Sequence, residues 1–489
     1  MNDFVQIREE DDVIVVLKPF KKGDRVDNIT LLDDVPRGHK VALHDRKKGD
    51  LLYKYGTVIG RVKKDIRKGE WVHSHNLETS LNSLEPSYTY HKIEIKTRKA
   101  SDKTWLGYLR SSSVAGTRND RYLVPTVGCV NSLLSLRKER FVALHPSFSH
   151  HVKILAHPYG CSQLGDDLAH TKKLLQSLSK NPNCGGLLVL GLGCENNRLS
   201  TFREELGPID KDRVKFFNAQ DQDDEISYGL TLRNELYEVR RKDKRTKLPL
   251  SRLTLGVKCG GSDGFSGLTA NPLLGRVSDI IGASGGKVCL TEVPERFGAE
   301  QSLRNRAKDE ATYEKIVSLI TDFKGYYARN NRPCYENPSP GNKDGGITTL
   351  EEKSNGCVLK GGRLEVEDVL DYGERAVKPG LSLVNGPGND LVACTDLAAA
   401  GCNLICFTTG RGTPFGSIVP TLKIGTNPIV SKKKADWIDF NGGRVLEEPW
   451  AQVTEDLLDL ILAIASGKEV KAERSDTDPI ALFKTGVTL

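Results

Sequence analysis

Several features are missing from this 489-residue chain, and each absence argues against a class of protein. No apolar run approaches the roughly 18 residues that a membrane-spanning helix needs. The first residues, MNDFVQIREEDD, are acidic and contain no apolar segment of a secretory signal, so we expect a cytoplasmic protein. None of the cysteines forms a Cys-x-x-Cys pair, so a zinc ribbon is unsupported and a disulfide scaffold is disfavoured.

Strong positive charge is also missing, because 71 Lys and Arg against 64 Asp and Glu give a formal net charge of only +7. The one dense basic run, residues 240–247, has no interleaved aromatic residue, which favours a solvated linker or helix end over a nucleic-acid surface. A mildly positive surface would help to capture an anionic substrate. We therefore expect a small-molecule partner, no nucleic acid and no membrane, and the sequence leaves a homo-oligomer open.

Six apolar runs end in loops that are rich in glycine and polar residues. Their sequences are VKILAHPYGCSQLGDD, GLLVLGLGCENN, LTLGVKCGGSDGFSG, KVCLTEVPE, LSLVNGPGNDL and LICFTTGRGTPFG. A continuous apolar run predicts a strand that is buried on both faces, as in a parallel sheet. Ligands bind in the crevice at the carboxyl ends of such strands, so the pattern favours an enzyme with one polar active site.

The strand and helix patterns divide the chain into three domains. Residues 1–95 contain short strand candidates separated by turns, which predicts a small β-rich domain. Residues 105–245 and 250–489 alternate apolar runs with helical stretches, which predicts two α/β domains with mainly parallel sheets. We expect a helix over 302–327 and another that begins at a Thr454 cap.

Two histidines, His73 and His75, lie two residues apart after a short apolar run. In an extended segment they point to the same face of the chain. Two imidazoles on one face suit a divalent metal such as iron, manganese or zinc. Direct contact with a substrate, or an ordinary surface pair, would explain the same spacing.

Polar groups gather after two other apolar runs. Glu195 and Asn196 follow one of them, and His157 and a tyrosine follow the other. Carboxylate, amide and imidazole groups at strand ends suit a polyhydroxylated ligand, although the same groups could satisfy helix N-termini. The nearby sequence GLGCEN resembles a dinucleotide fingerprint but lacks the third glycine, so it is a weak indication.

Four cysteines follow a glycine near the end of an apolar run: Cys129, Cys161, Cys194 and Cys357. Small buried thiols explain them as well as ligands or acid/base groups do. A cluster held by Cys161, Cys194 and Cys259 would fit the residue types, and sequence spacing does not test it.

Longer motifs carry a more specific resemblance. Examples are RGHKVALHD, GEWVHSHNLET, HPYGCSQLGDD, GGLLVLGLGCENN, CGGSDGFSGLTANPLLGRVSD, NPSPGNKDGGITTLEEKSNGC and FTTGRGTPFG. With these motifs in collinear order, from about residue 7 to the C-terminus, the chain resembles the altronate and galactarate dehydratase family.

The resemblance implies an N-terminal SAF domain of the β-clip type followed by two α/β portions. It also implies dependence on Fe²⁺ or Mn²⁺ and loss of water from a sugar acid. For D-altronate the product would be 2-dehydro-3-deoxy-D-gluconate, an intermediate of hexuronate breakdown. Dehydration of galactarate or a related acid is the alternative reaction, an anionic sugar-binding protein is the non-enzymatic alternative, and an iron–sulfur cluster is left open.

Dehydration next to a carboxylate assigns each candidate residue a role. Such a reaction needs a base for the α proton, a device for the charge that develops, and an acid for the departing hydroxyl. The catalytic candidates are His39, His73 and His157. The metal candidates are His73, His75 and Glu195, with Cys161, Cys194 and Cys259 as alternative cluster ligands. The substrate-binding candidates are Arg118, Asn196, Ser262, Asp263, Asn389, Asp390 and Arg411.

Overall fold

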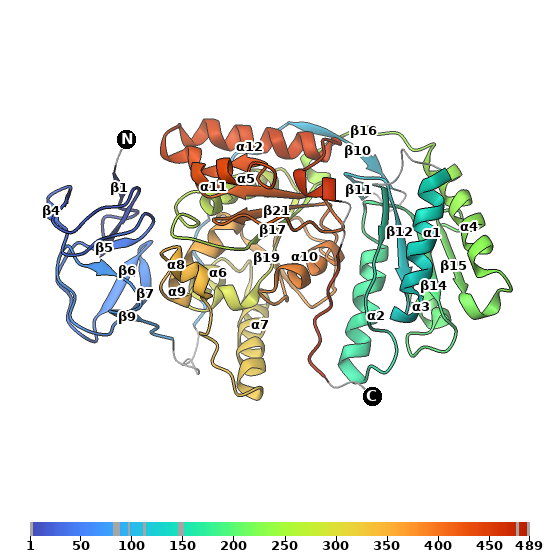
Figure 1. Cartoon of the computed structure of the whole chain (residues 1–489), viewed down its shortest axis with the longest axis horizontal. Helices are drawn as coiled ribbons and strands as arrows, with labels where there is room; N and C mark the ends of the chain where they lie inside the picture. Colours follow the sequence, from blue (N-terminus) through green and yellow to red (C-terminus); the bar gives the residue numbers. More distant parts are fainter. Residues whose placement is uncertain are drawn as a thin grey trace.

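The computed structural model describes residues 3–81, 89–95, 98–110, 114–144, 151–475 and 479–486. These residues form a row of three bodies (Figure 1). A β-rich N-terminal domain lies at one end, the C-terminal α/β domain lies in the middle, and the second domain lies at the other end. The expected class, α/β with a small β-rich N-terminal domain, is confirmed.

The N-terminal domain consists of short antiparallel strands joined by tight turns. Its sheets have the orders β1-β2-β5-β8 and β6-β7-β9, with a separate β3-β4 hairpin. The bounds are β1 Phe4–Val5, β2 Val13–Val16, β3 Arg25–Val26, β4 Ile29–Thr30, β5 Lys40–Ala42, β6 Leu51–Lys54, β7 Thr57–Val62, β8 Trp71–Val72 and β9 Leu77–Glu78. Strand β2 is buried at every position, because its residues face hydrophobic clusters on both sides of the sheet.

The second domain is built on four parallel strands in the order β13-β12-β14-β15. The strand bounds are β12 Asp120–Pro125, β13 Val152–Ile154, β14 Cys184–Gly191 and β15 Val214–Asn218. The helices are α1 Asn131–Leu144, α2 Gly165–Ser179, α3 Leu199–Leu206 and α4 Glu225–Arg240. Every residue of β12 is buried, as expected for a strand covered by helices on both faces.

A small antiparallel sheet joins the second domain to the rest of the chain. Strand β10 (Thr104–Leu109) pairs with β11 (Ala115–Gly116) on one side and with β16 (Thr246–Pro249) on the other. The chain therefore enters and leaves the second domain at one place. The basic run at 240–247 forms the end of α4 and the start of β16, and Arg245 donates to the carbonyls of Leu106 and Thr117.

The C-terminal domain is built on seven parallel strands in the order β19-β20-β18-β17-β21-β22-β23. The strand bounds are β17 Thr254–Cys259, β18 Lys287–Leu290, β19 Val366–Leu370, β20 Gly380–Val384, β21 Leu404–Thr409, β22 Thr421–Gly425 and β23 Phe440–Asn441. The helices are α5 Ala270–Ala283, α6 Glu300–Arg304, α7 Glu310–Arg329, α8 Pro340–Asp344, α9 Leu350–Cys357, α10 Asp390–Ala399, α11 Pro428–Lys433 and α12 Trp450–Ala465.

Two helices of this domain differ from the sequence prediction. The helix expected over 302–327 is broken into α6 and α7, and α7 begins after Asp309, whose side chain accepts a hydrogen bond from the Thr312 amide. Helix α12 begins at Trp450, so Thr454 is not its cap; the Thr454 hydroxyl instead donates to the Trp450 carbonyl within the helix. None of the helices formed by the described residues is long and apolar enough to cross a membrane.

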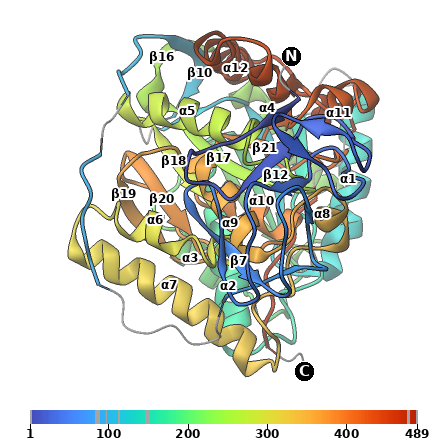
Figure 2. The same ribbon diagram turned by 90° about the vertical axis from the view of Figure 1, so that its left-hand side faces the viewer.

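The N-terminal domain docks on the C-terminal domain through buried charges. Figure 2 views the chain from the side of the N-terminal domain, with α8 and α9 near β7. Glu352 of α9 accepts hydrogen bonds from the ammonium groups of Lys40 and Lys54, each at 2.8 Å, and all three side chains are buried. Burial alone would raise the pKa of Glu352, but the two ammonium groups lower it to about 2.

Replacement of Glu352 by Gln should destabilise the chain by about 3–5 kcal/mol near neutral pH, because it leaves two ammonium groups buried without a carboxylate. The Glu352 carboxylate stabilises the fold above its usual pKa of 4.5, and this contribution is lost as the pH falls towards 2. The variant should therefore lose part of the acid dependence of its melting temperature between about pH 4.5 and pH 2.

Thermal melting followed by circular dichroism at several pH values measures both effects. Glu351→Gln is the matched control, because among the described residues the Glu351 carboxylate accepts hydrogen bonds from Thr79 and Ser80 and no ammonium group pairs with it. An equal loss of stability in the two variants would contradict this account of the interface.

Candidate functional site

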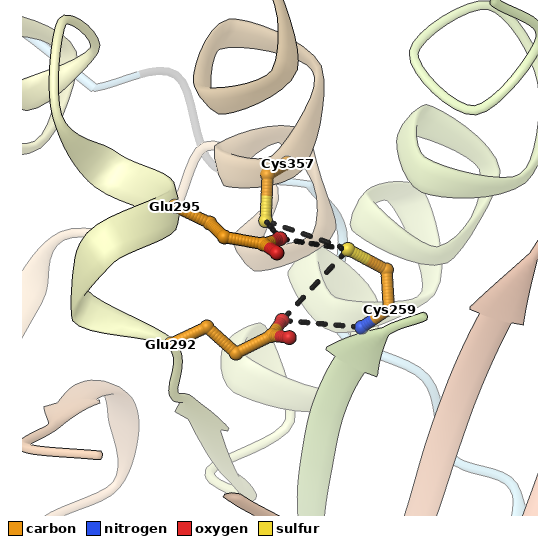
Figure 3. A group of neighbouring side chains, drawn as sticks. All are labelled: Cys259, Glu292, Glu295 and Cys357. Atoms are coloured by element: carbon orange, nitrogen blue, oxygen red, sulfur yellow. Dashed lines mark hydrogen bonds between the residues drawn. The ribbon is translucent and has the colours of Figure 1, made fainter. Parts of the chain in front are cut away.

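Four buried side chains with metal-ligating atoms meet at the carboxyl edge of the seven-stranded sheet (Figure 3). Cys259 is the last residue of β17, Glu292 and Glu295 follow β18, and Cys357 ends α9. The two sulfur atoms are 3.6 Å apart, and each lies 3.3 Å from Glu295 Oε2. We call this set the Cys/Glu group.

The local backbone aims the Cys/Glu group inward. Glu292 has φ = 71°, a left-handed conformation that is uncommon for a residue with a side chain and marks local strain. This turn begins the short helix η5 (Val293–Arg296), and it lets Glu292 Oε2 accept a hydrogen bond from the Cys259 amide at 3.2 Å. The strained residue therefore holds a carboxylate against the end of the neighbouring strand.

Three lysines surround the Cys/Glu group. Lys360 donates to Cys357 Sγ at 2.7 Å and to Cys259 Sγ at 2.9 Å, and it lies 3.4 Å from Glu292. Lys258 pairs with Glu292 at 3.0 Å and with Asp390, while Lys353 pairs with Glu295 at 2.8 Å. With neutral thiols, three ammonium groups therefore face three carboxyl groups, counting that of Asp390.

Burial and pairing shift the protonation of these groups in opposite directions. The hydrogen bond that Cys357 shares with Cys259 and burial raise the pKa of its thiol well above its usual value. Burial by itself lowers the pKa of Lys360. The two sulfur atoms and Glu292 raise it by more, so the pKa of Lys360 lies well above its usual value. Burial also raises the pKa of Glu295, but Lys353 and Lys360 bring it down to about 2.

The Cys/Glu group could hold a metal ion, because two thiolates and two carboxylates are ligands that divalent transition metals accept. The ammonium of Lys360 already lies between the sulfur atoms and Glu292, where a cation would be placed. Bound metal therefore requires ionised thiols and a Lys360 side chain that moves away or loses its proton. The thiol and carboxylate groups are suitable metal ligands, but the ammonium group of Lys360 already contacts three of them and would repel a cation.

The turn that follows Cys259 reaches the surface next to this group, and we call the surface around it, between Asp390 and Arg411, the candidate crevice. The turn at Gly260 and Gly261 has no side chains, and a Cβ atom at Gly260 would lie 2.8 Å from the Asp390 carboxylate. A Cβ atom at Gly261 would lie 3.4 Å from Arg411. Asp390, 40% exposed in its side chain, is therefore on one side of this turn and Arg411 is on the other. Asn389 caps α10 by accepting from the Leu391 and Val392 amides.

The segment 340–346 gathers several predicted residues around one backbone. Arg411 donates to the Gly341 carbonyl at 2.8 Å, and His73 and His39 contact the carbonyls of Lys343 and Asp344 at 3.0 and 3.3 Å. The Asn342 amide donates to the Ser262 carbonyl at 2.8 Å. Two domains thus meet at this segment, beside the crevice.

Asp263 lies buried behind the same segment. Its carboxylate accepts from the side chains of Thr426, Asn427 and Ser266, and burial raises its pKa. The carboxylate is thus held inside the protein by its own hydrogen bonds. In this state it shapes the crevice rather than contacting a ligand.

The rings of His39 and His73 lie beside Trp71 and are tilted by 31° to each other, with centroids 5.3 Å apart. Burial lowers the pKa of His39 to about 4, and it also lowers the pKa of His73. His75 lies against Trp71 at 5.2 Å and is exposed. The two metal-candidate histidines therefore flank a tryptophan, and Trp71 Nε1 donates to His39 Nδ1.

Glu195 lies far from His73 and His75 in the structure. It belongs to the second domain, which both views place on the far side of the C-terminal domain from the histidines. Its carboxylate accepts from the amides of Leu192 and Gly193 and from the Thr126 hydroxyl, so it stabilises its own loop. The metal set His73, His75 and Glu195 is not assembled in the chain.

Arg118 is positioned for structure rather than for substrate. Its guanidinium donates to both oxygens of Glu473, at 2.7 and 2.8 Å, and to the carbonyls of Thr117, Ile464 and Lys468. These bonds use all five of its N–H donors, so none is left for a sugar acid.

His157 is likewise engaged on both ring nitrogens. It is buried in the second domain, where Nε2 bonds to the Pro125 carbonyl and Nδ1 accepts from the Tyr159 amide. The exposed Asn196 accepts from the Ser162 amide. Cys161 and Cys194 lie near these residues, whereas Cys259 lies in the other domain, so the three do not form one cluster.

Sequence reasoning missed Glu292 and Glu295 of the Cys/Glu group and the three lysines around it, Lys258, Lys353 and Lys360; Cys357 was named only as one of four thiols that follow a glycine. One signal was present, because KVCLTEVPE carries two acidic residues directly after a strand. The lysines gave no signal, since isolated lysines are ordinary surface residues in a sequence.

Family models match the chain in three consecutive segments. Residues 2–80 match the altronate/galactarate dehydratase SAF domain, and residues 107–240 match the second domain of D-galactarate dehydratase/altronate hydrolase. Residues 250–488 match the C-terminal domain of D-galactarate/altronate dehydratase. Together the three matches follow the three bodies of the structure.

Individual relatives are similar over their whole length. Altronate dehydratase of Bacillus subtilis is 47% identical over 100% of both chains, and altronate dehydratase of Escherichia coli is 48% identical over 99% of this chain and 100% of its own. Galactarate dehydratase (L-threo-forming) of Escherichia coli is 30% identical over 95% of this chain and 93% of its own.

Replacement of Lys360 by Met should strengthen the binding of Mn²⁺ or Fe²⁺ at the Cys/Glu group by about tenfold or more. The substitution removes a positive charge beside the ion and so relieves a repulsion of a few kcal/mol. Anaerobic titration calorimetry measures the affinity. Lys360→Arg is the control, since it keeps the charge and should show no gain. Equal affinities in all three proteins would mean that the ion does not bind at this group.

Proposed function

Because this chain belongs to the altronate and galactarate dehydratase family, we propose that it removes water from a sugar acid, with D-altronate as the substrate and 2-dehydro-3-deoxy-D-gluconate as the product. The observation that carries the proposal is identity of 47% and 48%, over full length, with two altronate dehydratases, against 30% with a galactarate dehydratase. Galactarate or a related acid is the second candidate substrate.

The chemistry sets what the crevice must provide. A base removes the proton from the carbon next to the carboxylate, and the hydroxyl on the following carbon leaves with a proton as water. The resulting enol becomes the 2-keto acid. The α proton is weakly acidic, so the carboxylate needs positive charge or hydrogen-bond donors around it while the negative charge develops.

The crevice at Gly260 and Gly261 meets these needs. Arg411 is exposed and presents a guanidinium, which binds a carboxylate through two parallel hydrogen bonds. Asp390 presents a half-exposed carboxylate that can accept the α proton, and it pairs with Lys258 beneath it. We assign Arg411 to binding the substrate carboxylate, Asp390 to the base, and the exposed Asn389 to a hydroxyl group. Ser262 follows the turn but is only 3% exposed, so it supports the turn instead.

The histidines of the N-terminal domain complete the proposal. His73 contacts the Lys343 carbonyl and the Ser74 hydroxyl through its two ring nitrogens, and the exposed His75 lies against Trp71 beside it. We assign the departing hydroxyl to His75, with His73 as the residue that positions it. His39, whose two ring nitrogens contact Trp71 and Asp344, positions its neighbours. The N-terminal domain would thus supply the acid, and the C-terminal domain would supply the base.

We further propose that Fe²⁺ or Mn²⁺ activates the enzyme. Cys259, Glu292, Glu295 and Cys357 would hold the ion after Lys360 is displaced. When bound, such an ion supplies positive charge that stabilises a developing oxyanion. The residues themselves keep the site dry, since all four are buried, and Lys353 keeps Glu295 ionised.

Turnover of a panel of hexonates and hexarates tests the reaction. With Fe²⁺ added under anaerobic conditions, D-altronate should give a 2-keto product with a kcat/KM about tenfold or more above that of galactarate, a difference of about 1.4 kcal/mol in transition-state binding. Preference for galactarate would favour the second candidate substrate. Binding of these acids without any product would favour a sugar-binding protein.

Asp390→Asn should lower kcat by about 10²- to 10⁴-fold with a small change in KM, since it removes the base but keeps the shape of the side chain. Arg411→Gln should mainly raise KM. Steady-state kinetics measures both, with melting temperatures to show that the variants fold. Asp459→Asn is the control, because Asp459 pairs with Lys103 on the exposed face of α12. Full activity of Asp390→Asn would contradict the assignment.

A further inference from the structure

The exposed thiols of this chain are confined to one place. Of the eleven cysteines, three are exposed: Cys129, Cys161 and Cys194. The other eight are buried or half-buried. All three exposed thiols belong to the second domain, outside the crevice described above. Exposure at three related positions calls for a reason, because free cysteine is among the residues most often buried.

Each exposed cysteine follows a glycine after one of three adjacent strands. Gly128-Cys129 follows β12, Gly160-Cys161 follows β13, and Gly193-Cys194 follows β14. The sheet order β13-β12-β14 makes these strands neighbours, and they are parallel. The three Gly-Cys pairs therefore lie at the same carboxyl edge of the four-stranded sheet.

Hydrogen bonds join the three loops directly. The Gly128 amide donates to the Tyr159 carbonyl at 2.8 Å, and the Asn197 amide donates to the Gly160 carbonyl at 3.0 Å. The Asn197 side chain also donates to the Thr126 carbonyl at 3.0 Å. Each loop is thus bonded to both others, and the bonds lie within three residues of the cysteines.

The loops approach each other so closely at Gly128 and Gly160 that a side chain at either position would collide with the neighbouring backbone. At Gly160, with φ = 99°, an added Cβ atom would lie 2.0 Å from the Thr126 carbonyl oxygen. At Gly128 it would lie 2.8 Å from the His157 carbonyl oxygen. The backbones touch at the glycines, and the next residue of each pair, the cysteine, is left at the surface.

We propose that Cys129, Cys161 and Cys194 hold an iron–sulfur cluster of the [4Fe–4S] type, with one iron left without a protein ligand. Cysteine thiolates are the usual protein ligands of such clusters, and three of them leave one of the four irons open. The adjacent groups do not supply a fourth: His157 is bonded through both ring nitrogens, and both carboxylate oxygens of Glu195 accept hydrogen bonds from the loop.

The three thiols lie in the loops between strands and helices. Helices α2 and α3 begin four and five residues after Cys161 and Cys194, and α1 begins two residues after Cys129. The ligand set therefore differs from Cys161, Cys194 and Cys259: the third thiol is Cys129, and Cys259 belongs to the Cys/Glu group.

This site goes beyond the proposed dehydration, and its test does not use turnover. The full chain is purified without oxygen, then incubated with sulfide and with equal amounts of Fe²⁺ and Fe³⁺, which supply the ferrous and ferric ions of a [4Fe–4S]²⁺ cluster, and desalted. Iron and acid-labile sulfide should each reach about four per chain, with broad visible absorption and a paramagnetic signal after reduction. Iron or zinc bound without sulfide, or no metal at all, would overturn the proposal.

Single substitutions locate the ligands. Cys129→Ser, Cys161→Ser and Cys194→Ser should each lose most of the sulfide and the visible absorption. Cys184→Ser is the matched control, because Cys184 lies in β14 of the same domain and is half-buried. Retention of a full cluster in any of the first three variants would overturn the assignment of that thiol.

A measurement on the unaltered chain keeps the proposal testable if a variant fails to fold. The reconstituted and the metal-free chains are alkylated briefly, and the labelled cysteines are identified by mass spectrometry. Cys129, Cys161 and Cys194 should label quickly in the metal-free chain and should be protected together in the reconstituted chain. Labelling that is the same in both states would overturn the site.

Discussion

Pairing of three buried ammonium groups with three carboxyl groups holds together the carboxyl edge of the seven-stranded sheet. Burying a single charge costs several kcal/mol unless a partner lies close to it. Lys258 comes from β17, Glu292 and Glu295 from the turn after β18, and Lys353 from α9. Because each charge is compensated by a group from another element, these elements are held in one arrangement beneath the turn at Gly260 and Gly261.

Helix α9 extends this arrangement to the N-terminal domain. Two neighbouring residues of the helix point to different partners: Glu352 binds Lys40 and Lys54, and Lys353 binds Glu295. Cys357, one turn further, reaches the Cys/Glu group. Docking of the N-terminal domain therefore fixes the orientation of the helix that carries part of the buried group. The domain that brings His73 to segment 340–346 also supports the floor of the site.

Sequence patterns predicted the strand ends well, because strands buried on both faces leave continuous apolar runs that stop where the polar edge begins. They did not predict that residues from two domains gather at segment 340–346, because these contacts form only when the N-terminal domain docks on the C-terminal domain. His73 and Lys343 are 270 positions apart in the sequence. The partner of Cys259, Cys357, is 98 positions away, and no local pattern relates the two.

Buried arginine misled the sequence interpretation for a physical reason. Arg118 has the residue type of a carboxylate binder, and it does bind a carboxylate, that of Glu473, 355 positions later. Only the fold distinguishes an internal partner from a substrate. The start of α12 was predicted too late in the chain. The helix begins at Trp450, directly after Pro449, and a proline is well tolerated at the start of a helix, so the threonine at position 454 lies inside the helix.

The order of glycine and cysteine at a strand end decides what each thiol can do. In Cys259-Gly260 the cysteine is still part of β17, so its thiol is buried among lysines and carboxyl groups, and the glycine makes the turn. In Gly193-Cys194 the glycine makes the close approach, and the cysteine falls beyond it at the surface. A buried thiol can serve only the charge balance or an ion that displaces Lys360. An exposed thiol on a loop bonded to two similar loops is accessible to a metal or cluster from outside. The two parallel sheets of this chain thus place the same residue type in opposite environments by exchanging two neighbouring positions.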